Sequence, residues 1–284
     1  MCVSFPNRLL TALITALVLL SAVAADSFAQ GGQGLTSVQR EIERQRQRLT
    51  SSEVEDRRDA LMRLGNLKRP DASRAAVAGL NDPAPVVRVT AAHAILSLPP
   101  QEAVALLSPL LQDKLEFVRR ETAYALGETH SRAAVEPLAN VLLGDKEAGV
   151  RGAAAVALGE IREESGVLAL SQVLGGATPA QKKKKSKARE NEFVLRAAAR
   201  SLGQIRSRAA VDTLIAVLGN EDYAGDIRRE AAIALGLIGD SAAVPALRAA
   251  QASDDPYLSE AAHEALRRIN RARVANDKTS VNPL

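Results

Sequence analysis

The chain has 284 residues, of which 46% are hydrophobic but only 2% are aromatic. So few aromatic residues argue against a compact globular core and suit stacked helices rich in Ala, Leu and Val. A single cysteine, Cys2, excludes an intramolecular disulfide framework. The formal net charge of +4 is weak evidence for nucleic-acid binding.

The first 25 residues have the layout of a secretory signal peptide. Arg8 supplies a basic region, residues 9–20 form an uncharged apolar run, and residues 22–24 (Ala-Val-Ala) form a cleavage pattern. An uncleaved membrane anchor is the alternative, although residues 9–25 are somewhat short for a span. The sequence therefore predicts an exported protein, periplasmic or extracellular, with residues 1–25 removed.

A flexible linker and a charged helix follow. Residues 26–35 are rich in Gly and Gln, which is typical of a linker. Residues 36–49 place Val38, Ile42 and Leu49 on one side of a charged helix. We expect this helix to open a solenoid over residues 36–270, as part of the first repeat or as a polar cap. Residues 271–284 lose the periodicity and are predicted to form a disordered, frayed tail.

A short amphipathic pattern recurs along this region. Its clearest copy is Val118–Gly127, with the sequence Val-Arg-Arg-Glu-Thr-Ala-Tyr-Ala-Leu-Gly. The closing position falls at residues 65, 96, 127, 159, 203, 236 and 267. Successive closing positions are therefore 31 to 33 residues apart, except for one step of 44 residues. A period in this range indicates a solenoid.

Each position of the pattern has a structural interpretation. The ninth is always Leu or Ile and is predicted to be core, while the fifth and eighth are mostly small and let helices approach closely. The closing glycines suit the left-handed position that ends a helix. Another helix, with a Val-x-x-Leu core, precedes most copies of the pattern and is the first helix of its repeat. Its predicted N-caps are Ser131, Ser207 and Asp240 in three of the repeats. Each repeat is therefore predicted to be helix–turn–helix.

An aspartate also precedes an arginine by six residues in four repeats. The pairs are Asp82/Arg88, Asp113/Arg119, Asp145/Arg151 and Asp222/Arg228. Together with Val-Arg-x-x-Ala-x-x-Ala-Leu-Gly, this pattern resembles HEAT repeats over residues 53–270, of the short HEAT-like kind named after phycobilisome lyases. The resemblance implies an all-α, right-handed α-solenoid of about seven HEAT-like repeats. It also implies that these Asp and Arg residues form a ladder linking adjacent repeats.

The 44-residue step contains a basic insertion at residues 175–190. It carries Lys182, Lys183, Lys184, Lys185 and Lys187. The insertion falls in a turn between the two helices of a repeat, where insertions are expected. This repeat lacks the aspartate and its arginine is displaced to Arg196, so the ladder is predicted to be interrupted here.

The insertion has two interpretations, a solvated loop or a contact with an anionic surface or polymer. Removing Arg8 with the signal peptide lowers the net charge from +4 to +3, and removing the five lysines lowers it to −2. The solenoid itself is therefore not basic, which argues against nucleic acid as the partner.

No catalytic or metal-binding motif stands out. His93, His130 and His263 lie in different repeats or turns. His263-Glu264 is a single His-Glu dipeptide, whereas the HEAT-like deoxyhypusine hydroxylase needs several such pairs for its iron. The sequence also has no phosphate-binding glycine loop and no nucleophile elbow. We therefore expect no enzymatic activity, no cofactor and no metal.

Binding would use the third and seventh positions of the pattern, which lie one turn apart on the second helix. In HEAT-like proteins the second helices line the concave face. The resemblance thus places these residues in the middle of a groove: Arg120, Tyr124, Arg196, Arg200 and Arg229. Arg and Tyr are favoured at interface hot spots, and an ordinary solvated helix face is the alternative.

The sequence therefore favours a non-catalytic protein–protein interaction scaffold of the bacterial cell envelope, which binds a partner through its concave face. The alternative is a module that binds a polyanion or a membrane surface through the lysine-rich insertion. These two hypotheses differ in salt dependence, because polyanion binding falls steeply with salt. A third, an enzyme accessory factor of lyase type, has no supporting residue.

Overall fold

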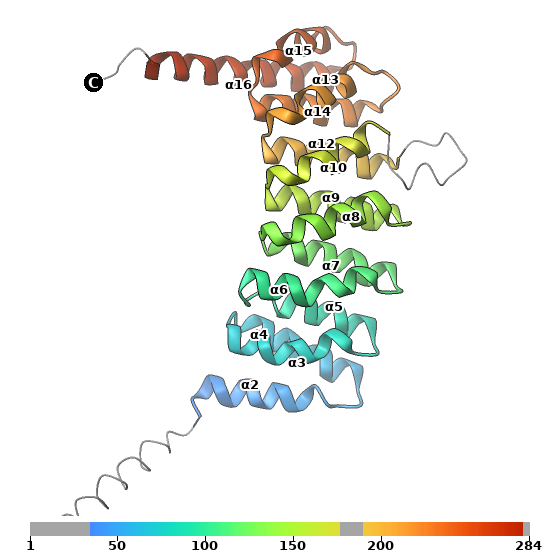
Figure 1. The fold of residues 1–284 in the computed structure, drawn as a ribbon, viewed down its shortest axis with the longest axis vertical. Coiled ribbons are helices and arrows are strands. Elements are labelled where there is room, and N and C mark those ends of the chain that lie inside the picture. Colours follow the sequence, from blue (N-terminus) through green and yellow to red (C-terminus); the bar gives the residue numbers. More distant parts are fainter. Residues whose placement is uncertain (1–34, 177–189, 281–284) are drawn as a thin grey trace, which may run out of the picture. The chain divides into compact units, whose positions relative to one another are not determined.

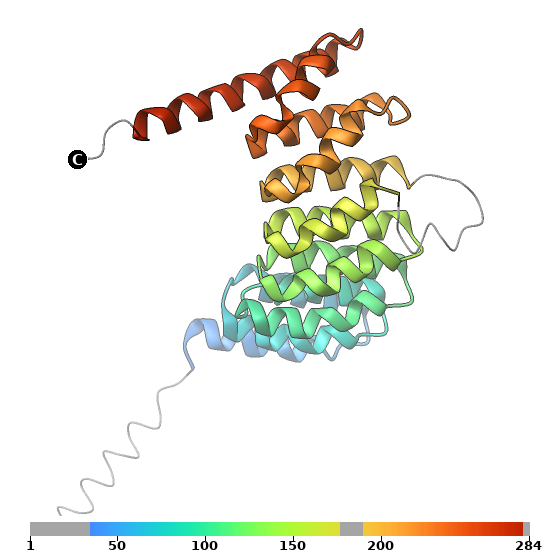
Figure 2. The ribbon, with the colours of Figure 1, turned by 45° about the horizontal axis from the view of Figure 1, so that its top comes forward.

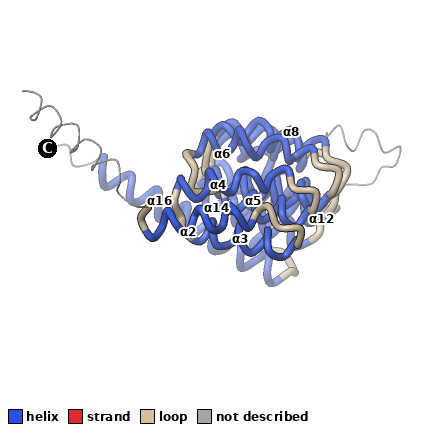
Figure 3. The backbone as a smooth tube through the Cα atoms, turned by 90° about the horizontal axis from the view of Figure 1, so that it is seen from below, coloured by secondary structure: helices blue, strands red, loops and turns tan. Residues whose placement is uncertain are grey.

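The computed structural model describes residues 35–176 and 190–280, with side chains described as far as Arg273. These residues form helices and loops without a strand (Figure 3). None of the described helices is both long enough and apolar enough to cross a membrane. The predicted signal peptide, nearly all of the linker and the lysines of the insertion lie outside the described residues.

The chain divides into two units, Met1–Arg44 and Gln45–Leu284. Helix α2 (Ser37–Arg48) begins in the first unit and ends in the second. Its start has a reciprocal cap, in which the backbone N–H of Gln39 donates to Thr36 Oγ1 at 3.2 Å and the Thr36 N–H donates to Gln39 Oε1 at 2.9 Å. The charged helix predicted for residues 36–49 is present with nearly these bounds.

The second unit is a stack of helix pairs (Figure 1). The first helices of the pairs are α4 (Pro70–Ala76), α6 (Pro100–Leu107), α8 (Val135–Gly144), α10 (Val167–Leu174), α13 (Val211–Gly219) and α15 (Val244–Gln251). The second helices are α3 (Val54–Asn66), α5 (Pro85–Ala94), α7 (Glu116–Glu128), α9 (Ala148–Ile161), α12 (Glu192–Ile205), α14 (Gly225–Ile238) and α16 (Pro256–Ser280). Successive second helices pack on each other, which is the arrangement of an α-solenoid.

Short 3₁₀ helices complete the first helices. η1 (Val77–Asn81) and η2 (Ser108–Gln112) extend α4 and α6, while η3 (Arg132–Ala134), η4 (Glu164–Gly166), η5 (Arg208–Ala210) and η6 (Ser241–Ala243) lead into the later ones. The predicted caps act on these turns: the hydroxyls of Ser131 and Ser207 and the carboxylate of Asp240 accept backbone N–H groups at 3.3, 3.1 and 2.9 Å. The entries to α8, α13 and α15 are therefore each fixed by a side chain.

The ninth position of the pattern forms the core. Leu64, Leu126 and Leu202 are fully buried, as are the other members up to Leu235. Only the last member, Leu266, is partly exposed. The reason is that no further repeat packs on α16 among the described residues.

The closing glycines do not end the helices, so that prediction was wrong. Gly203 and Gly236 lie within α12 and α14, where a Cβ would lie only 2.8 and 2.7 Å from the Cα atoms of Ala234 and Ala265. Glycine is needed there because consecutive second helices touch at this point. The left-handed position comes three residues later, at Lys68, His130, Arg162, Arg206 and Gly239.

The C-terminal boundary also differs from the prediction. Residues 271–284 were expected to form a frayed tail, but α16 continues through Arg271 to Ser280 (Figure 2). The side chain of Ile269 is buried, whereas Asn270 and Arg271 are exposed. Helix α16 therefore continues beyond Ile269, the last buried side chain that the structure describes.

Candidate functional site

The predicted ladder of arginines and aspartates runs along the turns between helices. Arg88 donates through Nε and Nη2 to the carboxylate of Asp113 at 2.8 and 3.1 Å, and Arg119 donates to Asp145 at 2.7 and 2.9 Å. Each arginine also donates to the backbone carbonyl of the aspartate in its own repeat: Arg88 to Asp82 at 2.8 Å and Arg119 to Asp113 at 3.0 Å. One guanidinium thus joins two successive turns.

Two members of the ladder were missed by sequence reasoning. Arg57 pairs with Asp82 at 2.6 Å, and Arg151 pairs with Glu190 at 2.5 Å. Arg57 occupies the second position of the pattern, like Arg88, and could have been found by alignment. Glu190 was not found because it is a glutamate where the other repeats have aspartate, and it stands one residue later than the expected spacing. The ladder therefore reaches the repeat with the insertion through Glu190, so the acidic residue that was expected to be missing there is present.

The ladder arginine is missing from the same repeat, as the sequence predicted. Leu195 occupies the second position of the pattern in α12, where the preceding repeats have arginine. Arg228, the last predicted arginine, donates through Nε to the carbonyl oxygen of Leu218 at 3.0 Å. Its predicted companion Asp222 donates its backbone N–H to Asn220 Oδ1 at 2.9 Å. The ladder thus links the turns from α3 to α12, and Arg228 of α14 binds a backbone carbonyl instead of a ladder carboxylate.

The charged groups of the ladder form ion pairs with one another inside the stack. The side chains of Arg119 and Asp145 are each only 8% exposed. Hydrogen bonds from Arg57 hold the pKa of Asp82 below its usual range. In another pair of the ladder, the hydrogen bond to Asp145 raises the pKa of Arg119. Charges held in this way are poor candidates for binding a ligand.

The five predicted partner-binding residues lie on the second helices, but the structure gives most of them partners within the stack. Arg196 and Arg200 of α12 each reach a carboxylate of α14, Asp226 and Glu230, at 2.5 Å. Glu230 raises the pKa of Arg200 through a hydrogen bond and its charge. The basic groove expected in the middle of this face is therefore largely neutralised.

The remaining predicted residues are Arg120, Tyr124 and Arg229. Arg120 lies over the ring of Phe117, 5.7 Å from its centre, and contacts Glu121 at 3.3 Å. Tyr124 is half-buried. Arg229 also lies over an aromatic ring, that of Tyr257, at 5.8 Å. Arg229 is therefore held by a cation–π contact.

Sequence reasoning missed an aromatic column. Phe117, Phe193 and Tyr257 all stand immediately before the first position of the pattern and are 40%, 38% and 71% exposed. They are three of only seven aromatic residues in the chain, and this shared position was the signal that could have found them. The ring of Phe193 packs directly over Gly152, the third position of the preceding repeat. An aromatic ring can thus cover the third position of the repeat before it.

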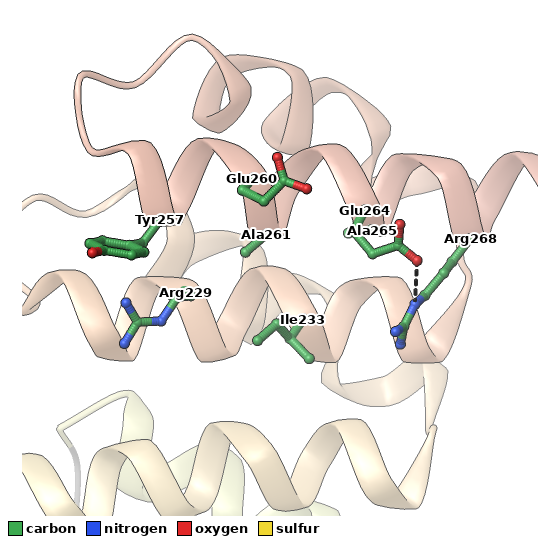
Figure 4. Close-up of a pocket in the computed structure, with 8 residues that line it drawn as sticks. All are labelled: Arg229, Ile233, Tyr257, Glu260, Ala261, Glu264, Ala265 and Arg268. Atoms are coloured by element: carbon green, nitrogen blue, oxygen red, sulfur yellow. Dashed lines mark hydrogen bonds and ion pairs between the residues drawn. The ribbon is translucent and has the colours of Figure 1, made fainter.

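A pocket of about 460 Å³ opens between α14 and α16 (Figure 4). Arg229 and Ile233 line it from α14. The α16 side carries Tyr257, Glu260, Ala261, Glu264, Ala265 and Arg268. Arg268 donates to Glu264 at 3.3 Å and lowers the pKa of that carboxyl. The pocket has an apolar floor and charged groups at its rim, as protein-binding and ligand-binding sites often do.

The histidines have separate surroundings. His93 lies 3.7 Å from Glu128 and 4.0 Å from Glu121, and His263 contacts Gln251 at 2.9 Å. His130 Nδ1 lies 3.1 Å from the carbonyl oxygen of Glu160. Within residues 35–176 and 190–280, no group of three or more His, Cys, Asp and Glu side chains could hold a metal ion.

Comparison with known proteins places the fold. A family model described as HEAT repeats matches residues 42–126, 111–181 and 185–267, which together cover more than half of the chain. Among curated proteins, none matches the sequence.

Three solved structures illustrate the structural likeness. YibA from Escherichia coli is 20% identical, with a TM-score of 0.55 over 82% of this chain and 82% of that chain. Human deoxyhypusine hydroxylase in complex with glycerol is 21% identical, with a TM-score of 0.41 over 89% and 91%. The complex of CpcE and CpcF of phycocyanin lyase from Nostoc sp. is 22% identical, with a TM-score of 0.47 over 87% and 96%. Likeness at this level of identity concerns the fold alone.

Proposed function

Because the chain belongs to the HEAT repeat family, we propose that it is a non-catalytic scaffold of the bacterial cell envelope that binds another protein. The helical repeats form the scaffold. The binding surface in this proposal is the face made by the second helices, the concave face expected of HEAT-like repeats. Solenoids use such extended faces to hold partners.

The observation that carries the proposal is the pocket between α14 and α16. It combines the partly exposed Ile233 with the strongly exposed Tyr257, which are 37% and 71% exposed. Exposed apolar and aromatic side chains beside charged ones are the composition of protein-binding hot spots. Elsewhere on this face, Arg196 and Arg200 already bind carboxylates of the stack. The proposal therefore centres the interface on the C-terminal repeats rather than on the middle of the face.

Export is part of the proposal and is supported by the sequence of residues 1–25, with its basic residue, apolar run and small-residue cleavage pattern. Expression of the full chain in a bacterial host, followed by cell fractionation and determination of the mature N-terminus, tests it. We expect the protein outside the cytoplasm and cleaved near residue 25. Recovery of the intact chain in the cytoplasm would reject the envelope assignment.

Site-specific photo-crosslinking tests the binding face. A photoreactive amino acid replaces Ile233 in α14 or, as the matched control, Leu168 in α10, which is 68% exposed but belongs to the first helices. We expect a discrete crosslinked protein from position 233 and none from position 168. Mass spectrometry identifies this protein, and titration with its purified form follows.

Variants of the protein and the pattern of crosslinks decide between the hypotheses. Ile233→Asp should abolish binding of the purified partner, whereas Leu168→Asp should leave it unchanged. Crosslinks from position 168 alone would reject the second-helix face. Binding that survives Ile233→Asp but is lost when the five lysines of the insertion are changed to serine would favour the polyanion-binding or surface-binding alternative.

A further inference from the structure

We call the line of contact between two successive second helices a seam. Two neighbouring seams have different side chains at equivalent positions. In the seam between α12 and α14, Arg196 meets Asp226 and Arg200 meets Glu230, each at 2.5 Å. In the next seam, between α14 and α16, the equivalents of Arg196 and Asp226 are Arg229 and Tyr257. The equivalents of Arg200 and Glu230 are Ile233 and Ala261. One seam is closed by two ion pairs, and the next has a cation–π contact and an apolar pair.

The first exchange puts an aromatic ring opposite Arg229, at the position where Arg196 has a carboxylate. Its guanidinium lies 5.8 Å from the centre of the Tyr257 ring. Within the described part of the chain, Arg229 forms no ion pair, whereas Arg196 has Asp226. Stacking on a ring occupies the flat face of a guanidinium and leaves its N–H groups at the edge available for hydrogen bonds. Arg229 is therefore prepared to receive a carboxylate from another molecule.

The second exchange opens the pocket. Alanine at position 261 replaces the long glutamate that fills the equivalent place in the preceding seam, and Ala265 adds a second small side chain one turn later. Ile233 borders the resulting space and is 37% exposed (Figure 4). A space bordered by Ile233, Ala261 and Ala265 suits an aliphatic side chain, because burying apolar surface there is favourable.

We propose that this pocket binds a segment of the partner that presents an acidic and an aliphatic side chain one helical turn apart. This inference rests on the proposed function and adds the chemistry of the partner. Arg229 and Ile233 are four residues apart on α14 and hence about 6 Å apart along its axis. The acidic side chain pairs with the edge of the Arg229 guanidinium, beside the Tyr257 ring, and the aliphatic side chain enters beside Ile233.

The charges on α16 fix the orientation of this segment. Glu260 and Glu264 line the α16 side of the pocket, and Arg268 binds Glu264 at 3.3 Å. A carboxylate of the partner is attracted by Arg229 and repelled by Glu264 at the other end, where Arg268 is already engaged by Glu264. The acidic residue therefore lies at the Arg229–Tyr257 end of the pocket, and the aliphatic residue lies toward Ala265.

Designed peptides test this chemistry with the full mature chain. The probe is a helical peptide of about 15 residues, long enough to form helix in water, with Glu and Leu four positions apart. Two matched controls carry Lys in place of that Glu, or Ser in place of that Leu. We expect methyl NMR shifts at Ile233, Ala261 and Ala265 with the Glu–Leu peptide, and affinity weaker by roughly tenfold for each control.

Charge variants of the protein complete the test. Arg229→Gln should weaken the Glu–Leu peptide by roughly fivefold, the scale of one partly exposed charge pair. Arg229→Asp should reverse the preference, so that the Lys peptide binds better than the Glu peptide. The matched control is Arg132→Gln, which removes the same charge from an exposed position in η3 and should leave affinity unchanged. Circular dichroism confirms that each variant remains folded.

The inference is overturned if the Glu and Lys peptides bind equally, if Arg229→Gln has no more effect than Arg132→Gln, or if the methyl shifts occur outside this pocket. These failures are distinguishable from failure of the proposed function. A partner crosslinked at position 233 that binds independently of Arg229 would retain the scaffold and reject the acidic–aliphatic segment. The absence of any crosslink at position 233 would reject the scaffold face itself.

Discussion

Arg151 in α9 and Glu190, which precedes α12, form a buried ion pair across two successive repeats. The Arg151 Nη2 and Nε atoms donate to the Glu190 carboxylate at 2.5 and 2.8 Å, and the two side chains are 6% and 2% exposed. On the other side of the insertion, the hydroxyl of Tyr223 donates to the carbonyl oxygen of Leu174 at the end of α10. The chain is thus held in place both just before the insertion, at Leu174, and just after it, at Glu190.

The first prediction follows from this pair. Glu190→Gln removes the charge but retains the size of the side chain, and it leaves a buried guanidinium without its counter-charge. We expect a loss of about 2–4 kcal/mol in the free energy of unfolding. Urea denaturation measures it, with the exposed Glu192→Gln as the matched control, expected within about 0.5 kcal/mol of the parent. Equal effects of the two variants would show that the ladder does not cross the insertion.

The second prediction concerns close contact between second helices. Gly203→Ala places a Cβ 2.8 Å from the Cα of Ala234, so α12 and α14 must separate. Overpacking of this kind costs about 1–3 kcal/mol. In contrast, none of the described atoms lies within 4 Å of a Cβ at Gly144, so Gly144→Ala should be neutral or stabilising. Thermal unfolding of the two variants checks this, and a stable Gly203→Ala protein would contradict the packing role.

The third prediction concerns the arginines that were expected to bind a partner. Arg200 lies 2.5 Å from Glu230, which is buried. Arg200→Ala removes the hydrogen-bond donor of this carboxylate and should lower the free energy of unfolding by about 1 kcal/mol. The control is Arg208→Ala, because Arg208 is 86% exposed in its pair with Asp240. It should cost nearly nothing. A double-mutant cycle with Glu230→Gln should give a favourable coupling of about 0.5–1 kcal/mol.

The fourth prediction is a pH dependence. Hydrogen bonds from Arg57 lower the folded-state pKa of Asp82 below its ordinary value of 3.8. A lowered folded pKa contributes stability above the unfolded pKa and loses it as the pH falls through the folded pKa. The difference in unfolding free energy between the parent and Asp82→Asn should therefore be constant near neutral pH and shrink below about pH 4. The exposed Glu221→Gln serves as the control, and a difference that persists at pH 2 would contradict the assignment.

Sequence period alone determined most of the fold. The ninth position of the pattern had to be core because its Leu or Ile recurs once per repeat on the same side of a helix, and residues such as Leu126 and Leu158 are fully or almost fully buried. The ladder could be predicted in part, because Asp113 and Arg119 recur at a fixed spacing. Local rules of this kind need only the neighbouring residues.

Tertiary structure decided what each position contacts across a seam. Gly203 was interpreted as a helix end because both that role and close helix contact favour glycine, and only the position of Ala234 distinguishes them. Arg196 and Arg229 are identical in type and position, yet one faces Asp226 and the other Tyr257. The partner comes from the next repeat, tens of residues away in the sequence, so a side chain's availability for binding depends on packing. For this reason the sequence indicated the face, and the structure moved the candidate site to the seam between α14 and α16.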